Sequence, residues 1–476
     1  MFETGIRQLR MAVGTLSGRR LDTRNIGRLV DDALATLAEF GEPGADVQQL
    51  IGGGAADPEE RLEATNRAVR RTARRLASVS PFYARRFAAI SAEVDQLDVA
   101  GLRAIPVTTK HDLAERAADF RCTDVAGYLS TRTTGTTGRP AEIWMSRYEM
   151  ELWPALSALA LVLRDELRPG DIMQVNFSSR AVAANHLASA QCRLANAGCR
   201  LLGIMAPDDA LDSLGEFGTT LLATYPSYLA ELVTAARRRG LGPEDFSLRR
   251  VTVGGEVLSP TLARAACQTL GVAHVEDTFS MTEVIPVTGR TCSQAHVHYD
   301  VSTGLTELLD LETGEPAEPG ALGTVVITPY FPYRDCMPVF RYDTRDVARA
   351  LADEPLSCEM ADVPATSQIL GKAGDLLHAA TGVATPRQLV DAIEALPTAP
   401  WPARYRAAVH EGRIALTLPA SAIADYGEAA AREHFADAGL DVELSIADDG
   451  RARPMRHTRS DLHETSFSAA QALVGA

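Results

Sequence analysis

The most constraining feature of this sequence is the alternation of short apolar runs with amphipathic segments between residues 172 and 275. Each apolar run predicts a buried strand, and a polar or glycine-bearing turn then leads into a segment with helical spacing. The expected strands are 172–177, 221–225, 250–253, 272–275 and 324–328, and the expected helices are 181–197, 227–239 and 260–270. This repetition predicts an α/β domain with a largely parallel sheet, in which ligands bind at the carboxyl ends of the strands.

The chain of 476 residues is too long for one ordinary core, so we expect a large domain and a small one. We place the boundary near Gly371, which gives an N-terminal domain over 1–370 and a C-terminal domain over 371–476. Residues 1–60 form a helical extension of the first domain to which we assign no chemistry. The second domain is a compact α+β unit with helices expected at 386–395 and 422–438 and strands at 413–418 and 441–446.

Two helix boundaries can be read from capping residues. The helical pattern over 58–90 is interrupted at Ser80-Pro81, because proline cannot continue a helix. Another helix is expected to begin at Lys110, with Thr108 or Thr109 as its N-cap.

Charge and cysteine content exclude several classes of protein. A net charge of −15 disfavours nucleic-acid binding, and the four arginines between Arg70 and Arg75 are interpreted as a solvated helix face. There is no run of eighteen uncharged apolar residues and no secretion signal, so we expect no membrane contact and a cytoplasmic location. Seven cysteines argue for reduced thiols or a metal site rather than disulfides. Only two lysines occur, Lys110 and Lys372, which makes each worth examining.

The stretch Thr131–Pro140 is rich in hydroxyls and glycines and is suited to hold a phosphate. Its donors would come from Thr133, Thr134, Gly135, Thr136, Thr137 and Gly138. It is not a Walker A loop, because Arg139-Pro140 follows Gly138 where that motif has lysine and Ser or Thr. Taken alone, the stretch is either a phosphate loop or a flexible turn.

Eight short motifs in order resemble the adenylate-forming superfamily, and within it the phenylacetate–coenzyme A ligase and coenzyme F390 synthetase-like branch. They are Ser80-Pro-Phe-Tyr83, Ile105-Pro-Val-Thr-Thr-Lys110, Thr133-Thr-Gly-Thr-Thr-Gly-Arg-Pro140, Thr224-Tyr-Pro-Ser-Tyr-Leu229, Gly254-Gly-Glu256, Phe279-Ser-Met-Thr-Glu283, Arg341-Tyr-Asp-Thr-Arg-Asp346 and Ile369-Leu-Gly-Lys372. The resemblance covers the chain from about residue 58. It implies a large domain of layered sheets and helices and a small mobile α+β C-terminal domain.

The resemblance also implies an activity, which is the use of ATP and Mg²⁺ to convert a carboxylic acid into an acyl-adenylate with release of pyrophosphate. The implied catalytic residues are Thr282, Glu283 as the Mg²⁺ ligand, Lys372 and Arg451. The implied ATP-binding residues are the six of the phosphate loop with Gly254, Gly255, Glu256, Asp277, Thr278, Phe279, Ser280, Thr282, Asp346 and Lys372.

Three departures from the pattern of the superfamily leave alternatives open. Lys372 replaces an arginine, Gly374 replaces a hinge aspartate, and Arg451 stands where the catalytic lysine is expected. A non-catalytic nucleotide-binding relative is therefore one alternative. Gly382 is one residue out of register for the loop that admits coenzyme A, so the acyl acceptor is either coenzyme A or an amine, a hydroxyl or a carrier-protein thiol, as in secondary metabolism.

The resemblance places the acid pocket near Arg180, Asn185, His186, Tyr225 and Gly254. Polar side chains there favour a substituted aromatic acid, because a buried polar group requires a partner.

Some members of the coenzyme F390 synthetase-like branch carry Cys and His at points that match Cys292, His298, Cys336 and Cys358. These residues are either a structural zinc site or separate buried thiols, with His296 as the reserve ligand. The resemblance also implies a homodimer.

Overall fold

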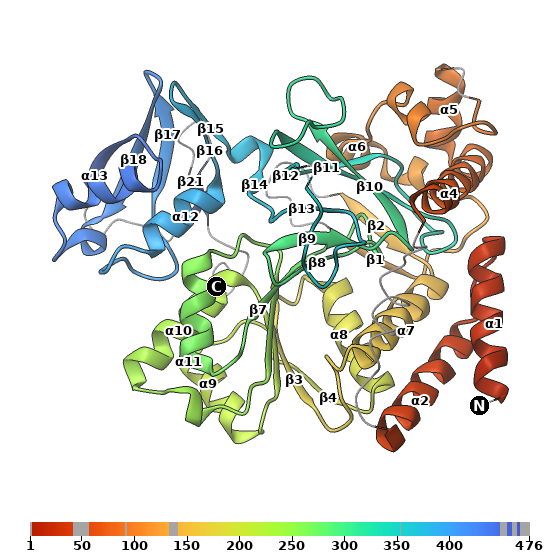
Figure 1. Cartoon of the computed structure of the whole chain (residues 1–476), viewed down its shortest axis with the longest axis horizontal. Helices are drawn as coiled ribbons and strands as arrows, with labels where there is room; N and C mark the ends of the chain where they lie inside the picture. Colours follow the sequence, from red (N-terminus) through yellow and green to blue (C-terminus); the bar gives the residue numbers. More distant parts are fainter. Residues whose placement is uncertain are drawn as a thin grey trace.

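The computed structural model describes residues 2–40, 57–90, 93–132, 141–352 and 354–447, and two short strands at 455–458 and 464–466. The loop 133–140 and Arg451 therefore lie outside the described residues. The structure is a mixed α/β fold with a large N-terminal part and a smaller C-terminal part (Figure 1). No helix in the described part of the chain combines the length and the apolar character needed to cross a bilayer.

The helices follow one another from the N-terminal edge of the molecule to the C-terminal part. They are α1 (Phe2–Ser17), α2 (Thr23–Phe40), α4 (Pro58–Val79), α5 (Pro81–Ala89), α6 (Lys110–Phe120), α7 (Arg147–Leu163), α8 (Val182–Leu194), α9 (Pro207–Glu216), α10 (Pro226–Arg239), α11 (Pro260–Leu270), α12 (Pro386–Glu394) and α13 (Glu428–Asp437). Short 3-10 turns occur at Ala100–Ala104, Pro243–Asp245, Ala373–Asp375 and Ala420–Ile423.

The central sheet has eight strands in the order β13-β9-β8-β7-β6-β5-β3-β4. Its parallel strands are β3 (Ile172–Asn176), β4 (Gly198–Leu201), β5 (Leu221–Thr224), β6 (Arg250–Gly254) and β7 (Val275–Phe279). The antiparallel strands β8 (Gly289–Thr291), β9 (His296–Tyr299) and β13 (Ala365–Ser367) extend it at one edge. The prediction of a largely parallel sheet is confirmed.

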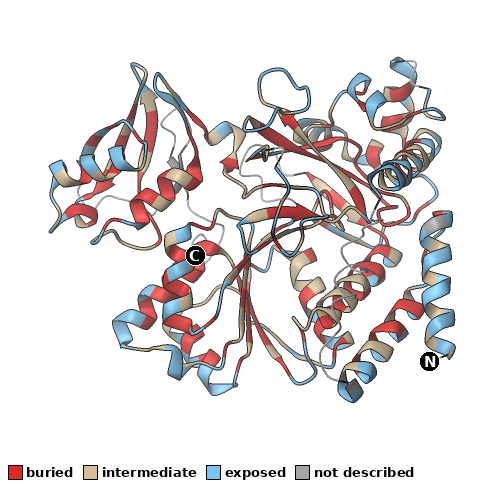
Figure 2. Ribbon diagram, in the orientation of Figure 1, coloured by how far each residue is buried: buried red, intermediate tan, exposed pale blue. Residues whose placement is uncertain are grey.

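Helices cover both faces of this sheet (Figure 1). One buried cluster joins α9, α10 and α11 to β5 and β6, and another joins α2, α7 and α8 to β3 and β5. Figure 2 shows these inward helix faces and the strands as buried. Apolar burial on both faces explains why β5, with the sequence Leu-Leu-Ala-Thr, is buried along its whole length.

The remaining strands form smaller sheets. The antiparallel sheet β10-β11-β12-β14 contains β10 (Gly304–Asp310), β11 (Leu322–Pro329), β12 (Tyr342–Arg349) and β14 (Gly371–Lys372). A hairpin is formed by β1 (Leu129–Arg132) and β2 (Glu142–Met145), which flank the loop 133–140.

The C-terminal part has its own buried cluster over residues 377–444, formed by α12, α13 and the strands between them. The strands are β15 (Leu377–Ala379), β16 (Gly382–Ala384), β17 (Arg406–His410), β18 (Arg413–Pro419) and β19 (Val442–Ala447). Strands β20 (Met455–Thr458) and β21 (Glu464–Ser466) pair with each other.

Local sequence signals explain many helix boundaries. Ser80 ends α4 and caps α5, whose first residue is Pro81, as predicted. The predicted start of α6 at Lys110 is confirmed, with Thr109 in a capping box.

Two predicted elements were misplaced. The strand expected at 272–275 is β7 at Val275–Phe279, because Gly271 ends α11 with a positive φ and residues 272–274 form the connection. The helix expected at 422–438 begins only at Glu428, because Gly427 has φ +84° and cannot continue a right-handed helix.

Candidate active site

The carboxyl ends of β3, β5, β6 and β7 meet at one edge of the central sheet. Asn176 pairs with Thr224, Thr224 with Val253, and Gly254 with Thr278. The turns that follow these strands carry most of the residues predicted to bind the acid and the nucleotide. The fold therefore gathers those residues at the edge where parallel sheets bind ligands.

Glu283 is the centre of the charged groups near this edge. It follows β7 and is only 3% exposed. The hydroxyl of Tyr342, at the start of β12, hydrogen-bonds to Glu283, and burial together with nearby carboxylates raises the pKa of Tyr342. Lys110 lies near enough to Glu283 for the carboxylate to raise its pKa, although burial has the larger effect and lowers the pKa of Lys110 overall.

Backbone pairing explains how Lys110 reaches this position. Thr108 N donates to Arg341 O at 2.7 Å, and Asp343 N donates to Thr108 O at 2.9 Å. The Thr108 segment thus lies alongside the start of β12, and α6 starts two residues later at Lys110. The Thr109 cap then fixes the first turn of α6 beside Tyr342.

The predicted ribose acid and the predicted cation pair with each other. Lys372 Nζ lies 2.9 Å from Asp346 Oδ2 and donates to Thr344 O at 3.1 Å. The pair is set by the register of β12 and β14, in which Asp346 faces Lys372. Lys372 is also close enough to Lys110 to lower its pKa, so both lysines of the chain lie at one site.

Other predicted nucleotide residues have structural partners. A Cβ on Gly254 would lie 2.8 Å from Thr278 O, so glycine is required where these strands meet. Glu256 accepts a hydrogen bond from Ser227 N at 2.9 Å and caps α10. Phe279 is buried, with its ring packed edge-to-face on Tyr299. Ser280 is exposed and Thr282 half-buried in the turn that leads to Glu283.

The predicted acid-pocket residues gather around the turn after β3, and most of their side chains make hydrogen bonds. Asn185 Nδ2 donates to Ser178 O at 3.1 Å, and Ser178 N donates to the Tyr225 hydroxyl at 3.3 Å. His186 Nε2 lies 3.0 Å from Met150 O of α7, which is the bond of a satisfied core histidine. Arg180 is exposed at the same turn.

Asp277 binds an arginine that the sequence did not single out. Arg387 of α12 donates to Asp277 Oδ2 at 3.0 Å, and burial raises the pKa of Asp277 more than this arginine lowers it. Arg387 also donates to Ile369 O at 2.7 Å and to Leu258 O. The carboxylate of Asp277, which the resemblance places near ATP, thus forms an ion pair between the two parts of the chain.

Three further contacts dock the C-terminal part on the large part. Asp391 accepts from Thr261 N at 2.9 Å at the start of α11, and Glu394 accepts from the Ser259 hydroxyl. The guanidinium of Arg237 lies 5.0 Å from the ring centroid of Trp401. We call these three contacts and the Asp277–Arg387 pair the α12 latch.

A possible metal centre contains Cys292, His296, His298 and Cys358, whose donor atoms lie within 4.8 Å of one another. Cys358 Sγ is 3.4 Å from His298 Nε2, and His298 Nδ1 is 2.9 Å from Val363 O. In the described part of the chain, His296 Nδ1 is buried without a hydrogen bond. Two thiols and two imidazoles, one of which carries this orphaned nitrogen, fit tetrahedral Zn²⁺.

The prediction that Cys336 is a ligand was wrong. Cys336 packs beside α7, where its N–H donates to Glu149 Oε1 at 3.0 Å and its carbonyl accepts from Cys122 N at 2.9 Å. His296 takes the fourth place, because His296 and His298 are two residues apart on β9 and so share a face. That spacing was a signal in the sequence that favoured the reserve ligand.

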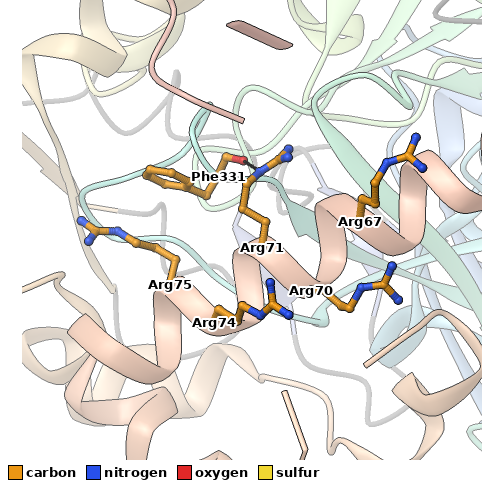
Figure 3. A pocket seen from close by; sticks show the side chains of 6 residues that line it. All are labelled: Arg67, Arg70, Arg71, Arg74, Arg75 and Phe331. Carbon is orange, nitrogen blue, oxygen red and sulfur yellow. Dashed lines mark hydrogen bonds between the residues drawn. The ribbon is translucent and has the colours of Figure 1, made fainter. Parts of the chain in front are cut away.

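A hollow of about 440 Å³ on α4 is lined by Arg67, Arg70, Arg71, Arg74, Arg75 and Phe331 (Figure 3). Three of the arginines pair with carboxylates, Arg67 with Glu63, Arg74 with Asp95 and Arg75 with Asp124. The Arg71 guanidinium donates to Phe331 O at 3.1 Å. These contacts agree with the interpretation of the stripe as a solvated, ion-paired helix face.

Comparison with known proteins agrees with this geometry. Residues 128–330 match the AMP-binding enzyme family. The chain thus contains a stretch similar to an AMP-binding enzyme domain.

Its curated relatives include the phenylacetate–coenzyme A ligases of Pseudomonas putida and Thermus thermophilus. The first is 25% identical over 57% of this chain and 62% of its own length, and the second is 26% identical over 52% and 54%. The chain thus matches less than two thirds of the length of either relative. A solved 2-hydroxyisobutyryl-CoA ligase in a postadenylation state has the same fold, with a TM-score of 0.72, 18% identity, and coverage of 88% of this chain and 92% of its own.

Proposed function

We propose that this protein activates a carboxylic acid with ATP and Mg²⁺ to form an acyl-adenylate, and then transfers the acyl group to coenzyme A. The observation that carries the proposal is the grouping of Glu283, Lys110, Asp346 and Lys372 beside the carboxyl edge of a parallel sheet. The names of the relatives, phenylacetate–coenzyme A ligase and 2-hydroxyisobutyryl-CoA ligase, support acid–coenzyme A ligation.

In the first step a carboxylate oxygen of the acid attacks the α-phosphorus of ATP, and the bond to the β-phosphate oxygen breaks to release pyrophosphate. Asp346 would accept the ribose hydroxyls, and Lys372 and Lys110 would offset phosphate charge. The buried carboxylate of Glu283 is a hard oxygen ligand and fits Mg²⁺, which would neutralise the phosphates when bound. Gly254 would let a flat ligand pass close to the backbone.

In the second step the thiol of coenzyme A attacks the acyl carbon, AMP leaves, and the thiol proton passes to solvent. The α12 latch holds the C-terminal part against α11, so a different orientation of that part would require these contacts to break. Coenzyme A is the acceptor that the names of the relatives support, and an amine, a hydroxyl or a carrier-protein thiol are the other outcomes of the test.

The experiment is acid-dependent exchange of labelled pyrophosphate into ATP, with a panel of substituted benzoic, arylacetic and aliphatic acids. We expect exchange to be fastest with substituted aromatic acids, because polar groups of Asn185 and Tyr225 lie near the proposed pocket. The variant Glu283→Gln should lower exchange by roughly 10²–10³-fold, whereas Glu312→Gln, on an exposed turn, should not.

Two results would contradict the proposal. Measured ATP binding without exchange for any acid would favour a non-catalytic nucleotide-binding protein. Exchange followed by persistent free acyl-AMP in the presence of coenzyme A would retain the first step and reject the second.

We also propose a structural zinc at Cys292, His296, His298 and Cys358. The ion would tie the β8–β9 hairpin to the segment that leads into β13, because Cys292 and both histidines come from the former and Cys358 from the latter. Metal analysis of the purified chain should find one zinc per chain, and the variant Cys358→Ser should lose it. The matched variant Cys336→Ser should keep it, and loss of zinc in both would contradict the assignment.

A further inference from the structure

The hollow on α4 concentrates positive charge on one face of a helix (Figure 3). Its arginines are three or four residues apart in sequence, so their side chains leave the helix on the same side. From residue 66 to its end at Val79, α4 contains no acidic residue. Arginines four residues apart repel one another, so the stripe has an electrostatic cost that a bound anion would offset.

Carboxylates of the protein neutralise only part of this charge. Three of the five arginines have the acidic partners given above. Arg70 and Arg71, in the middle of the stripe, pair with no carboxylate among the described residues. Arg70 Nη1 lies 3.5 Å from Leu97 O, at the limit of a hydrogen bond, and Arg71 Nε donates to Phe331 O. Five guanidinium groups against three carboxylates leave the hollow with an excess of two positive charges.

Arg71 is positioned to receive an anion. The turn after α1 packs against it so closely that a Cβ on Gly18 would collide with the guanidinium group. The bond from Nε to Phe331 O fixes the plane of that group, and in the part of the chain that the structure describes neither Nη1 nor Nη2 makes a hydrogen bond. Burial lowers the pKa of Arg71, and no described carboxylate offsets this effect.

The free nitrogens of Arg71 match the geometry of a phosphate group. Two parallel N–H donors on one guanidinium bind two oxygens of a phosphate, and such charge-assisted hydrogen bonds are stronger than neutral ones. A phosphate monoester carries a charge of about −1.5 to −2 at neutral pH, which matches the excess of two positive charges. The volume of about 440 Å³ also lies within the roughly 300–1,000 Å³ of small-molecule sites.

We propose that the hollow binds the phosphate group of a small phosphorylated molecule, held by Arg70 and Arg71. The other arginines of the stripe add attraction at longer range. None of the lining residues belongs to the proposed nucleotide site, so this proposal does not depend on the proposed function.

The test is isothermal titration calorimetry of the full chain with glycerol 3-phosphate. Wild type should bind the probe at low ionic strength, and the affinity should fall as salt is added. The variants Arg70→Met and Arg71→Met should each weaken binding by roughly tenfold or more, because each removes a charged donor. Arg71→Lys should restore only part of the affinity, since lysine keeps the charge and lacks the planar fork.

Two controls locate the binding. Arg85→Met, at an exposed arginine of α5 that pairs with Asp119 outside the hollow, should bind the probe like wild type. Lys372→Met alters the proposed nucleotide site and should also leave this binding unchanged. Pyrophosphate exchange should stay at the wild-type rate in Arg70→Met and Arg71→Met, which keeps the outcome for the hollow separate from the outcome for the proposed function.

Two results would overturn the proposal. One is a wild type that does not bind glycerol 3-phosphate, including a protein that cosediments only with vesicles containing phosphatidic acid, which presents the same phosphate on a lipid. The other is binding that Arg70→Met and Arg71→Met leave unchanged, which would place the phosphate elsewhere, and in the nucleotide site if Lys372→Met abolishes it. Circular dichroism would confirm that the variants fold.

Discussion

The Asp277–Arg387 pair of the α12 latch provides a sharp test of the structure. Arg387 is 7% exposed and donates to four groups, namely the Asp277 carboxylate, the carbonyls of Ile369 and Leu258, and Gln368 Oε1 at 3.0 Å. The variant Arg387→Met removes every donor and leaves a buried carboxylate without its cation. Breaking a buried pair in this way costs about 3–5 kcal/mol of unfolding free energy.

The pH dependence of this loss has a defined sign. Burial already raises the pKa of Asp277, and removal of Arg387 takes away the nearby charge that lowers it. A raised pKa in the folded state favours folding at low pH, and that contribution is lost as pH rises through the folded pKa. The loss caused by Arg387→Met should therefore be largest at neutral pH and shrink on acidification, as Asp277 becomes protonated.

The assay is calorimetric and urea unfolding of wild type, Arg387→Met and the double variant with Asp277→Leu. The double variant should recover part of the unfolding free energy that Arg387→Met loses, because the buried carboxylate of Asp277 is no longer present. The control is Arg413→Met, which breaks the exposed 2.9 Å pair with Asp441 and should cost less than about 1 kcal/mol. Equal losses for Arg387→Met and Arg413→Met, or a loss that grows on acidification, would refute the reasoning.

Three further predictions concern the site itself. Thr109→Ala removes the cap of α6, so calorimetry should show a loss of about 1 kcal/mol, and exchange should slow because Lys110 is less well placed. Lys110→Met should raise the melting temperature at neutral pH, since burial lowers the pKa of Lys110 and disfavours its charged form, yet it should lower pyrophosphate exchange. Tyr342→Phe removes the hydrogen bond to Glu283 and should slow exchange by roughly tenfold without loss of the fold. An unchanged rate of pyrophosphate exchange in all three variants would show that these groups do not contribute to catalysis.

Local sequence rules were sufficient to predict helix boundaries that a single capping residue or proline determines. The cap at Thr109, the Ser80-Pro81 break and the helix at 260–270 were predicted because capping and proline act within a few residues. Rules of this kind do not reach β12, whose residues are largely polar motif residues rather than an apolar run. Its burial comes from neighbours on other strands, so the strand was not predicted.

Long-range contacts account for the features of the site that the sequence did not predict. Resemblance grouped Cys336 with the metal ligands, but the fold carries it to α7 and brings in His296. Nothing in the sequence distinguished Arg387 from the other arginines, so its ion pair with Asp277 was not predicted. Lys110 stood out in the sequence because the chain has only two lysines. Only the pairing of Thr108 with β12 showed that Lys110 faces Glu283.

The confinement of both lysines to one site has a chemical consequence. Arginine guanidinium groups stay protonated and resist acylation, so almost the whole basic surface of this protein is inert to amine-directed reagents. Lys110 and Lys372 are the only side-chain amines, and burial favours the neutral, nucleophilic form of Lys110. An acylating reagent therefore reports on the occupancy of the proposed nucleotide site, and ATP should protect both amines from it.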